Sequence, residues 1–263
     1  MLISAVKSLV GAAACVLLLA WLLQERMIFF PQQLVQRPAR AGAEEVMITS
    51  ADGTILRGWL VRGEGSPAPL VIYFGGNAEE VSWLTGLADQ FAGWSLLLVN
   101  YRGYGESEGR PGEKELTADA LAVYDYAKRR KDVNPDRIVA VGRSLGSGVA
   151  TYLAAERPLR GVILVSPYDS LVEVGRRHYP FLPISLMLRH RFDSIARAPR
   201  IDTPLLCLVA ADDRVIPTPH SRALFAAWRG EKTWQEVANA DHDSIAGEPE
   251  YWRSIAMFLK SLR

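Results

Sequence analysis

The stretch Gly142-Arg143-Ser144-Leu145-Gly146 joins two runs of different character. Residues 137–141 before it are mostly apolar, as in a buried strand, and residues 147–155 after it are rich in small, helix-compatible side chains. A glycine at each end permits a sharp turn from strand to helix, which lifts the Ser144 hydroxyl into a cleft. The stretch therefore predicts an α/β fold with a serine nucleophile at a strand-to-helix turn.

A second Gly-x-Ser-x-Gly match competes with the first, because the bare pattern is short. It is Gly105-Glu106-Ser107-Glu108-Gly109, followed by Arg110-Pro111-Gly112. Proline and glycine at that point favour a loop over a helix, and the two carboxylates beside Ser107 would repel a developing oxyanion. We therefore predict that Ser144 is the nucleophile and that Ser107 is a loop residue.

The remaining chain alternates short apolar runs with helical patterns, which indicates a mostly parallel central sheet flanked by helices. Asp52-Gly53 predicts a hairpin at its antiparallel edge. Strands are expected over 45–49, 54–61, 69–74, 95–100, 137–141, 161–165, 204–209 and 233–237, and helices over 78–91, 113–130, 145–157 and 248–262.

The amino-terminal segment is set apart by its apolar run, residues 8–23, which is slightly short for a hydrocarbon core of about 30 Å. We expect residues 1–30 to form a single-pass signal anchor and 31–43 a linker. A cleaved signal peptide and a buried helix are the alternatives. The flanking basic residues do not decide which side of the membrane the domain occupies.

The domain itself is expected over 44–263, with one long connection, 168–202, as a small helical lid over the cleft. A packed surface excursion is the alternative, and the arginines of this connection suit either anionic groups or a solvated face. Lys plus Arg (30) nearly balance Asp plus Glu (29), which argues against a nucleic-acid surface. Cys15 and Cys207 give neither zinc spacing nor a disulfide framework, so no metal is expected.

A serine hydroxyl needs a base, and histidine is suited to that task. At a turn of this kind the chain order is serine, acid, histidine. His178 and His190 precede the expected acid, and His220 is expected at the surface, where a helix starts. His242 follows the last expected strand, where a loop can return to Ser144, and we predict that it is the base.

The acid is expected after a strand that precedes His242. Asp212 and Asp213 both follow the strand over 204–209, and Asp169 follows the strand before that one. The residues alone leave these three open. For the oxyanion, the expected donors are the backbone N–H of Leu145 and that of Asn77 in Gly75-Gly76-Asn77, with Gly76 the second choice.

Several segments together resemble the α/β-hydrolase superfamily, and more closely its membrane-anchored, bud-emergence-type branch, which is related to serine-aminopeptidase-like hydrolases. They are Glu25-Arg26-Met27-Ile28-Phe29-Phe30-Pro31, Tyr73-Phe74-Gly75-Gly76-Asn77-Ala78, residues 100–109 and residues 142–148. In that family the acid stands four positions before a proline, which implies Asp213. The family often has a histidine where this chain has Gly75, so a side-chain contact from the oxyanion loop is lost while the backbone donor stays.

The resemblance implies a serine hydrolase that cleaves carboxylic esters or thioesters, with a small acyl-ester or lipid-acyl substrate and without a metal or organic cofactor. Peptide or amide cleavage on the same machinery is one alternative. A non-catalytic member that binds a lipid or a protein is the other. Neither the acyl chain length nor the oligomeric state follows from the residues.

Overall fold

The computed structural model describes residues 2–38, 40 and 42–262, without the side chains of 2–3, 5–6, 9–10 and 12–14. Its strands are β1 (Ala43–Thr49), β2 (Ile55–Val61), β3 (Ala68–Phe74), β4 (Ser95–Val99), β5 (Val133–Arg143), β6 (Gly161–Val165), β7 (Leu205–Ala210) and β8 (Lys232–Val237). Its α-helices are α1 (Leu2–Ile28), α2 (Glu113–Arg129), α3 (Leu145–Glu156), α4 (Leu171–His178), α5 (Ile184–Met187), α6 (Ser194–Arg197), α7 (Thr218–Ala227) and α8 (Pro249–Ser261). Three 3₁₀ helices are η1 (Val81–Phe91), η2 (Ala198–Arg200) and η3 (Ile245–Gly247).

The strands form one sheet in the order β1-β2-β4-β3-β5-β6-β7-β8. Strand β2 pairs antiparallel with both β1 and β4, and the pairs from β4 across to β8 are parallel. The expected mostly parallel sheet with an antiparallel hairpin at its edge is therefore confirmed. Gly53, at φ +87° in the hairpin, adopts the left-handed conformation that glycine tolerates.

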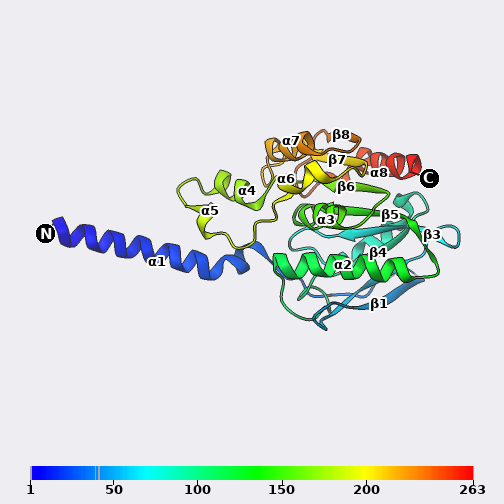
Figure 1. The fold of residues 1–263 in the computed structure, drawn as a ribbon, viewed down its shortest axis with the longest axis horizontal. Helices are drawn as coiled ribbons and strands as arrows, with labels where there is room; N and C mark the ends of the chain where they lie inside the picture. The colour runs from blue at the N-terminus through cyan, green and yellow to red at the C-terminus, as the bar shows by residue number, and fades with distance from the viewer. Residues whose placement is uncertain (1, 39, 41, 263) are drawn as a thin grey trace.

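Each face of the sheet carries its own core, because successive side chains of a strand point to opposite faces. On β3, Leu70 and Ile72 pack with α2 and α3, whereas Val71 and Tyr73 pack with η1 and α8. Figure 1 labels α2, α3 and α8 around the sheet. Burial on both faces explains why the strands read as continuous apolar runs.

The expected helix over 78–91 is only partly right. The chain has φ +56° at Ala78, which is outside the helical region, and η1 begins at Val81 with a hydrogen bond from Ser82 N–H to the side chain of Glu80 as its N-cap. It ends before Ala92, where φ is +53°.

Helix α1 projects from the domain and meets it at its carboxyl-terminal end (Figure 1). Phe29, directly after α1, is buried in the core that α2 and α3 share. Within the part of the chain that the structure describes, no helix has the length and hydropathy needed to cross a membrane. The expected anchor over 1–30 includes residue 1 and several side chains that lie outside this description. The long connection expected to be a lid, residues 168–202, contains α4, α5, α6 and η2.

Candidate active site

The turn between β5 and α3 holds Ser144 in a conformation that L-residues rarely adopt, with φ 49° and ψ −116°. A Cβ on Gly146 would lie 2.1 Å from the carbonyl oxygen of Phe74, and one on Gly142 would lie 2.3 Å from that of Gly146. Both glycines are therefore required by the close approach of backbone to backbone. Strained positions of this kind cluster at functional sites.

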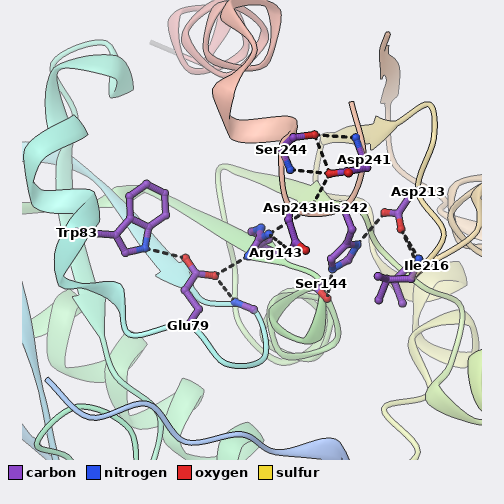
Figure 2. A network of polar contacts seen from close by, with 12 residues as sticks. Glu79, Trp83, Arg143, Ser144, Asp213, Ile216, Asp241, His242, Asp243 and Ser244 are labelled. Atoms are coloured by element: carbon purple, nitrogen blue, oxygen red, sulfur yellow. Dashed lines mark hydrogen bonds and ion pairs between the residues drawn. The ribbon is translucent and has the colours of Figure 1, made fainter. Parts of the chain in front are cut away.

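Ser144, His242 and Asp213 form a continuous hydrogen-bonded chain (Figure 2). Ser144 Oγ is 2.9 Å from His242 Nε2, and His242 Nδ1 is 2.8 Å from Asp213 Oδ2. The three residues come from the ends of β5, β8 and β7, which lie on the same edge of the parallel sheet, and all three are buried. Because the Asp213 carboxylate accepts a hydrogen bond from Nδ1–H, the other ring nitrogen, Nε2, carries no proton and is free to take the serine proton.

Asp213 is fixed by its own loop. Its Oδ1 accepts from the N–H groups of Val215 at 2.9 Å and Ile216 at 2.7 Å, which leaves Oδ2 for His242. Burial alone would raise the pKa of the Asp213 carboxyl, but the hydrogen bond and charge of His242 and the Ile216 N–H outweigh it and lower this pKa below its usual range. Asp213 therefore stays ionised beside the imidazole.

The other two candidate acids do not reach His242. Asp212 is exposed, and Asp169 lies 3.0 Å from Nδ1 of His220 instead. The expectation that His220 is a surface residue is wrong, because its side chain is only 12% exposed and packs beside Asp169. Asp241 caps its own turn by accepting from Ser244.

The oxyanion donors expected from the sequence lie at one cavity together with Ser144. Leu145 is the first residue of α3, so its N–H has no partner within the helix. The N–H of Gly76 donates to Glu79 Oε2 at 2.6 Å and is occupied, so of the two candidates Asn77 remains the expected second donor. The side-chain oxygen of Asn77 accepts from Phe30 N–H at 2.9 Å and Tyr104 O–H at 3.1 Å, which fixes this loop.

Glu79 organises the oxyanion loop, and the sequence analysis missed it. This buried carboxylate accepts from Arg143 at 3.2 Å and from Trp83 Nε1–H at 3.3 Å (Figure 2). It also accepts from Gly76 N–H at 2.6 Å and from Tyr73 O–H at 2.9 Å. Arg143 also donates to the carbonyl oxygen of His242 at 3.0 Å. Burial alone would lower the pKa of the Arg143 guanidinium, but the charge of Glu79 outweighs it and raises this pKa. The Glu79–Arg143 pair therefore ties the oxyanion loop to the loop of the base.

Ser107 has a structural environment. Its Oγ accepts from Arg57 N–H at 2.8 Å and donates to the carbonyl oxygen of Asn100 at 3.0 Å. The contact with Arg57 holds the loop after β4 against β2, and the contact with Asn100 closes the loop on itself. No histidine hydrogen-bonds to this serine within the described residues.

A cavity of about 320 Å³ opens at Ser144. That volume is at the lower end of the range for small-ligand pockets. Asn77 and Leu145 lie at the same end, and the walls are mostly apolar side chains from α1, α4, α5 and the loop at 215–216. In the described part of the chain, no cluster of His, Cys, Asp and Glu side chains is arranged to hold a metal ion.

Comparisons with known proteins agree with this fold. A sequence model described as the alpha/beta hydrolase fold matches residues 69–190. An uncharacterized Mycobacterium tuberculosis protein, Rv2307c, is 36% identical over an alignment of 237 positions that covers 88% of this chain and 84% of that protein. The alpha/beta hydrolase domain-containing protein WAV2 of Arabidopsis thaliana is 26% identical over an alignment of 269 positions that covers 90% of this chain and 87% of that one. An acetyl xylan esterase from Paenibacillus sp. R4 superposes with a TM-score of 0.69 at 22% identity, over 87% of each chain.

Proposed function

This chain belongs to the α/β-hydrolase family, and we propose that it is a serine hydrolase that cleaves carboxylic esters or thioesters through an acyl-enzyme. The observation that carries the proposal is the buried chain of contacts from Ser144 through His242 to Asp213, at 2.9 and 2.8 Å. It opens into an apolar cavity of about 320 Å³ that suits an acyl group.

In the first half of the reaction, His242 Nε2 takes the Ser144 proton as Oγ attacks the carbonyl carbon. Asp213 stabilises the imidazolium that forms and holds its tautomer. The carbonyl oxygen becomes an oxyanion that accepts from the N–H groups of Leu145 and Asn77. His242 then donates the proton to the leaving alkoxide or thiolate as the bond to the acyl carbon breaks.

In the second half, water takes the place of the leaving group. His242 accepts a proton from the water as its oxygen attacks the acyl carbon of the ester on Ser144. The same two N–H groups stabilise the second oxyanion, and its collapse returns the proton to Ser144 Oγ and releases the carboxylic acid. No metal or organic cofactor takes part in this sequence.

We propose further that the chain belongs to the membrane-anchored, bud-emergence-type branch, with residues 1–30 as a single-pass anchor. Exposed apolar side chains along α1, including Leu18, Leu19 and Leu22, support this proposal. Membrane association of the full chain that resists alkaline carbonate is the expected result. Release of the protein by carbonate would contradict the anchor and leave the hydrolase proposal standing.

The first test is covalent labelling of the full chain in detergent with a fluorophosphonate, which reacts with activated serines. Labelling should be lost in Ser144→Ala and kept in Ser107→Ala, the matched control within the second Gly-x-Ser-x-Gly match. Equal labelling of wild type and Ser144→Ala would overturn the site assignment. An unlabelled but folded wild type would instead favour the non-catalytic binding protein.

The second test compares p-nitrophenyl esters, acyl thioesters and aminoacyl amides as substrates for the wild type. We expect hydrolysis of the first two classes with Ser144-dependent kcat. Hydrolysis of the amides alone would replace the proposed activity with that of a serine peptidase or amidase.

A further inference from the structure

We infer that α1 forms one wall of the acyl-binding site, so that the substrate's acyl chain lies between this helix and the lid. The inference rests on the proposed hydrolase function and names the part of the chain that selects the acyl group. Its starting point is the cavity at Ser144, whose lining includes five residues of α1: Ala20, Trp21, Gln24, Met27 and Ile28.

The cavity-lining residues of α1 share one face of the helix. Their spacing follows the period of 3.6 residues, whereas Leu22 lies about 200° around the helix from Ala20 and is exposed. From Ile28 to Ala20 the wall is about 12 Å long at 1.5 Å per residue. The Ile28 end of this wall lies near the loop at Asn77, because Phe30, two residues after Ile28, donates its N–H to the Asn77 side chain. Ala20 therefore lies at the end of the wall farther from this loop.

The opposite wall comes from the lid. It consists largely of apolar side chains on α4, α5 and the segment between and after them, among them Leu171, Val174, Leu182, Ile184 and Met187. A cavity that Ser144 lines together with mostly apolar side chains suits an acyl chain. Each methylene buried there contributes about a fourfold gain in kcat/KM.

Gln24 holds the two walls together. This side chain is buried in a helix whose neighbouring residues are exposed, and it pairs with the lid backbone. Its Nε2 donates to the carbonyl oxygen of Met187 at 3.2 Å, and its Oε1 accepts from Arg189 N–H at 2.8 Å. Gln24 is therefore a positioning residue for the acyl site, since it acts through the lid and does not touch the reacting atoms.

Arg189 adds a second set of contacts between the lid and α1. The guanidinium carbon of Arg189 lies 4.7 Å from the ring centroid of Trp21, and a guanidinium N–H donates to the backbone carbonyl oxygen of Trp21 at 3.2 Å. It also pairs with Glu25 at 3.4 Å. Together with Gln24, these contacts fix the width of the gap in which the acyl chain would lie.

The test narrows the far end of the site with Ala20→Trp and uses Leu22→Trp, on the opposite face of α1, as the matched control. Wild type, both variants and Gln24→Ala are assayed with p-nitrophenyl esters from acetyl to palmitoyl. Ala20→Trp should lower the ratio of long-chain to short-chain kcat/KM by about fifteenfold, the value of two excluded methylenes. Leu22→Trp should leave the ratio unchanged.

Gln24 is tested by its effect on KM. Gln24→Ala should raise KM for long-chain esters more than it lowers kcat, and Gln24→Glu, which still accepts from Arg189 N–H, should fall between it and the wild type. Chain-length profiles of Ala20→Trp and Gln24→Ala that match Leu22→Trp would overturn the inference.

A binding measurement separates failure of this inference from failure of the proposed function. A fluorescent long-chain fatty acid should bind the wild type and Leu22→Trp, and more weakly Ala20→Trp, whether or not the protein hydrolyses esters. An inactive wild type that shows this binding pattern would overturn the hydrolase proposal and keep the acyl site. Equal binding by all three would overturn the acyl site.

Discussion

Replacing Glu79 should separate the stability of the oxyanion loop from the chemistry at Ser144. In Glu79→Ala, the buried guanidinium of Arg143 loses its 3.2 Å partner and Gly76 N–H loses its acceptor. Breaking a buried ion pair costs about 3–5 kcal/mol. Arg143 keeps the carbonyl oxygen of His242 at 3.0 Å and Asp243 at 3.5 Å, but the buried Tyr73 hydroxyl also loses its acceptor, so we expect about 4 kcal/mol.

Glu79→Gln keeps the shape and removes the charge. Its amide oxygen can still accept from Gly76 N–H and Arg143, and its amino group can donate to the Tyr73 hydroxyl but cannot accept from Trp83 Nε1–H, which lies 3.3 Å from Oε1. A hydrogen bond to a charged group is worth about 1 kcal/mol more than a neutral one, so losing the charge at the contacts with Gly76, Tyr73 and Arg143 should cost about 3 kcal/mol.

The fall in kcat should depend on how well the loop at Gly76 and Asn77 is oriented and not on the free energy of unfolding. If Glu79 orients Gly76 and Asn77, then Glu79→Ala loses up to one oxyanion donor, which is worth about 10²–10³ in rate. We expect a fall in kcat of at least tenfold in Glu79→Ala and a smaller one in Glu79→Gln, with KM for an acetyl ester little changed, because the donor acts chiefly in the transition state.

The assay measures kcat and KM with an acetyl ester, and the free energy of unfolding from urea titrations of the same preparations. Glu44→Ala is the control, because Glu44 forms partly exposed ion pairs with Arg62 and Arg130 far from the site. Its cost should stay below about 1 kcal/mol with unchanged kcat. A Glu79→Ala variant that is destabilised but keeps the wild-type kcat would refute the idea that Glu79 positions the donor.

Three further outcomes follow from the same contacts. Gly146→Ala should lose about 3 kcal/mol of stability in urea unfolding, since its Cβ would meet the Phe74 carbonyl oxygen at 2.1 Å; a loss below 1 kcal/mol would show that the turn relaxes. The lowered pKa of Asp213 stabilises the fold above its unfolded value of about 3.9, and this contribution disappears as the pH falls through the folded pKa. The difference in unfolding free energy between wild type and Asp213→Asn should therefore be largest near neutral pH and shrink below about pH 4, and a difference that does not vary with pH would contradict the lowered pKa. Burial raises the pKa of the Cys207 thiol, so iodoacetamide should modify Cys207 only after unfolding, as mass spectrometry of the peptides would report; modification of the folded protein would contradict its burial.

The features that sequence analysis predicted are those that depend on local pattern and chain order. The apolar runs gave the strands of the parallel sheet, and the glycines around Ser144 gave its turn. The expected His242 and Asp213 follow later strands, and the carboxyl ends of parallel strands meet at one edge of the sheet, where ligands bind in such folds. Chain order therefore predicts that His242 and the candidate acids lie near Ser144, whereas the choice of Asp213 among those acids came from the family resemblance.

The features that it missed depend on contacts between distant segments. Glu79 and Arg143 are 64 residues apart, and Gln24 and Arg189 are 165 apart, so no local spacing links either pair. The start of η1 at Val81 was also missed, because it depends on the left-handed conformation of Ala78 and not on helical periodicity.

The choice between the two Asp–His pairs shows why geometry is needed after chain order. Asp169 and His220 are 3.0 Å apart, as close as a catalytic pair, and both are largely buried. However, this pair lies where α7 meets the start of the lid, and the backbone carbonyl of Asp169 accepts from Ile195 N–H at 2.9 Å at the lid's other end. Its contacts hold the base of the lid, whereas only His242 has Ser144 within hydrogen-bond distance of its second nitrogen. A carboxylate beside an imidazole is thus common to both sites, and the serine on the far nitrogen distinguishes the proposed catalytic one.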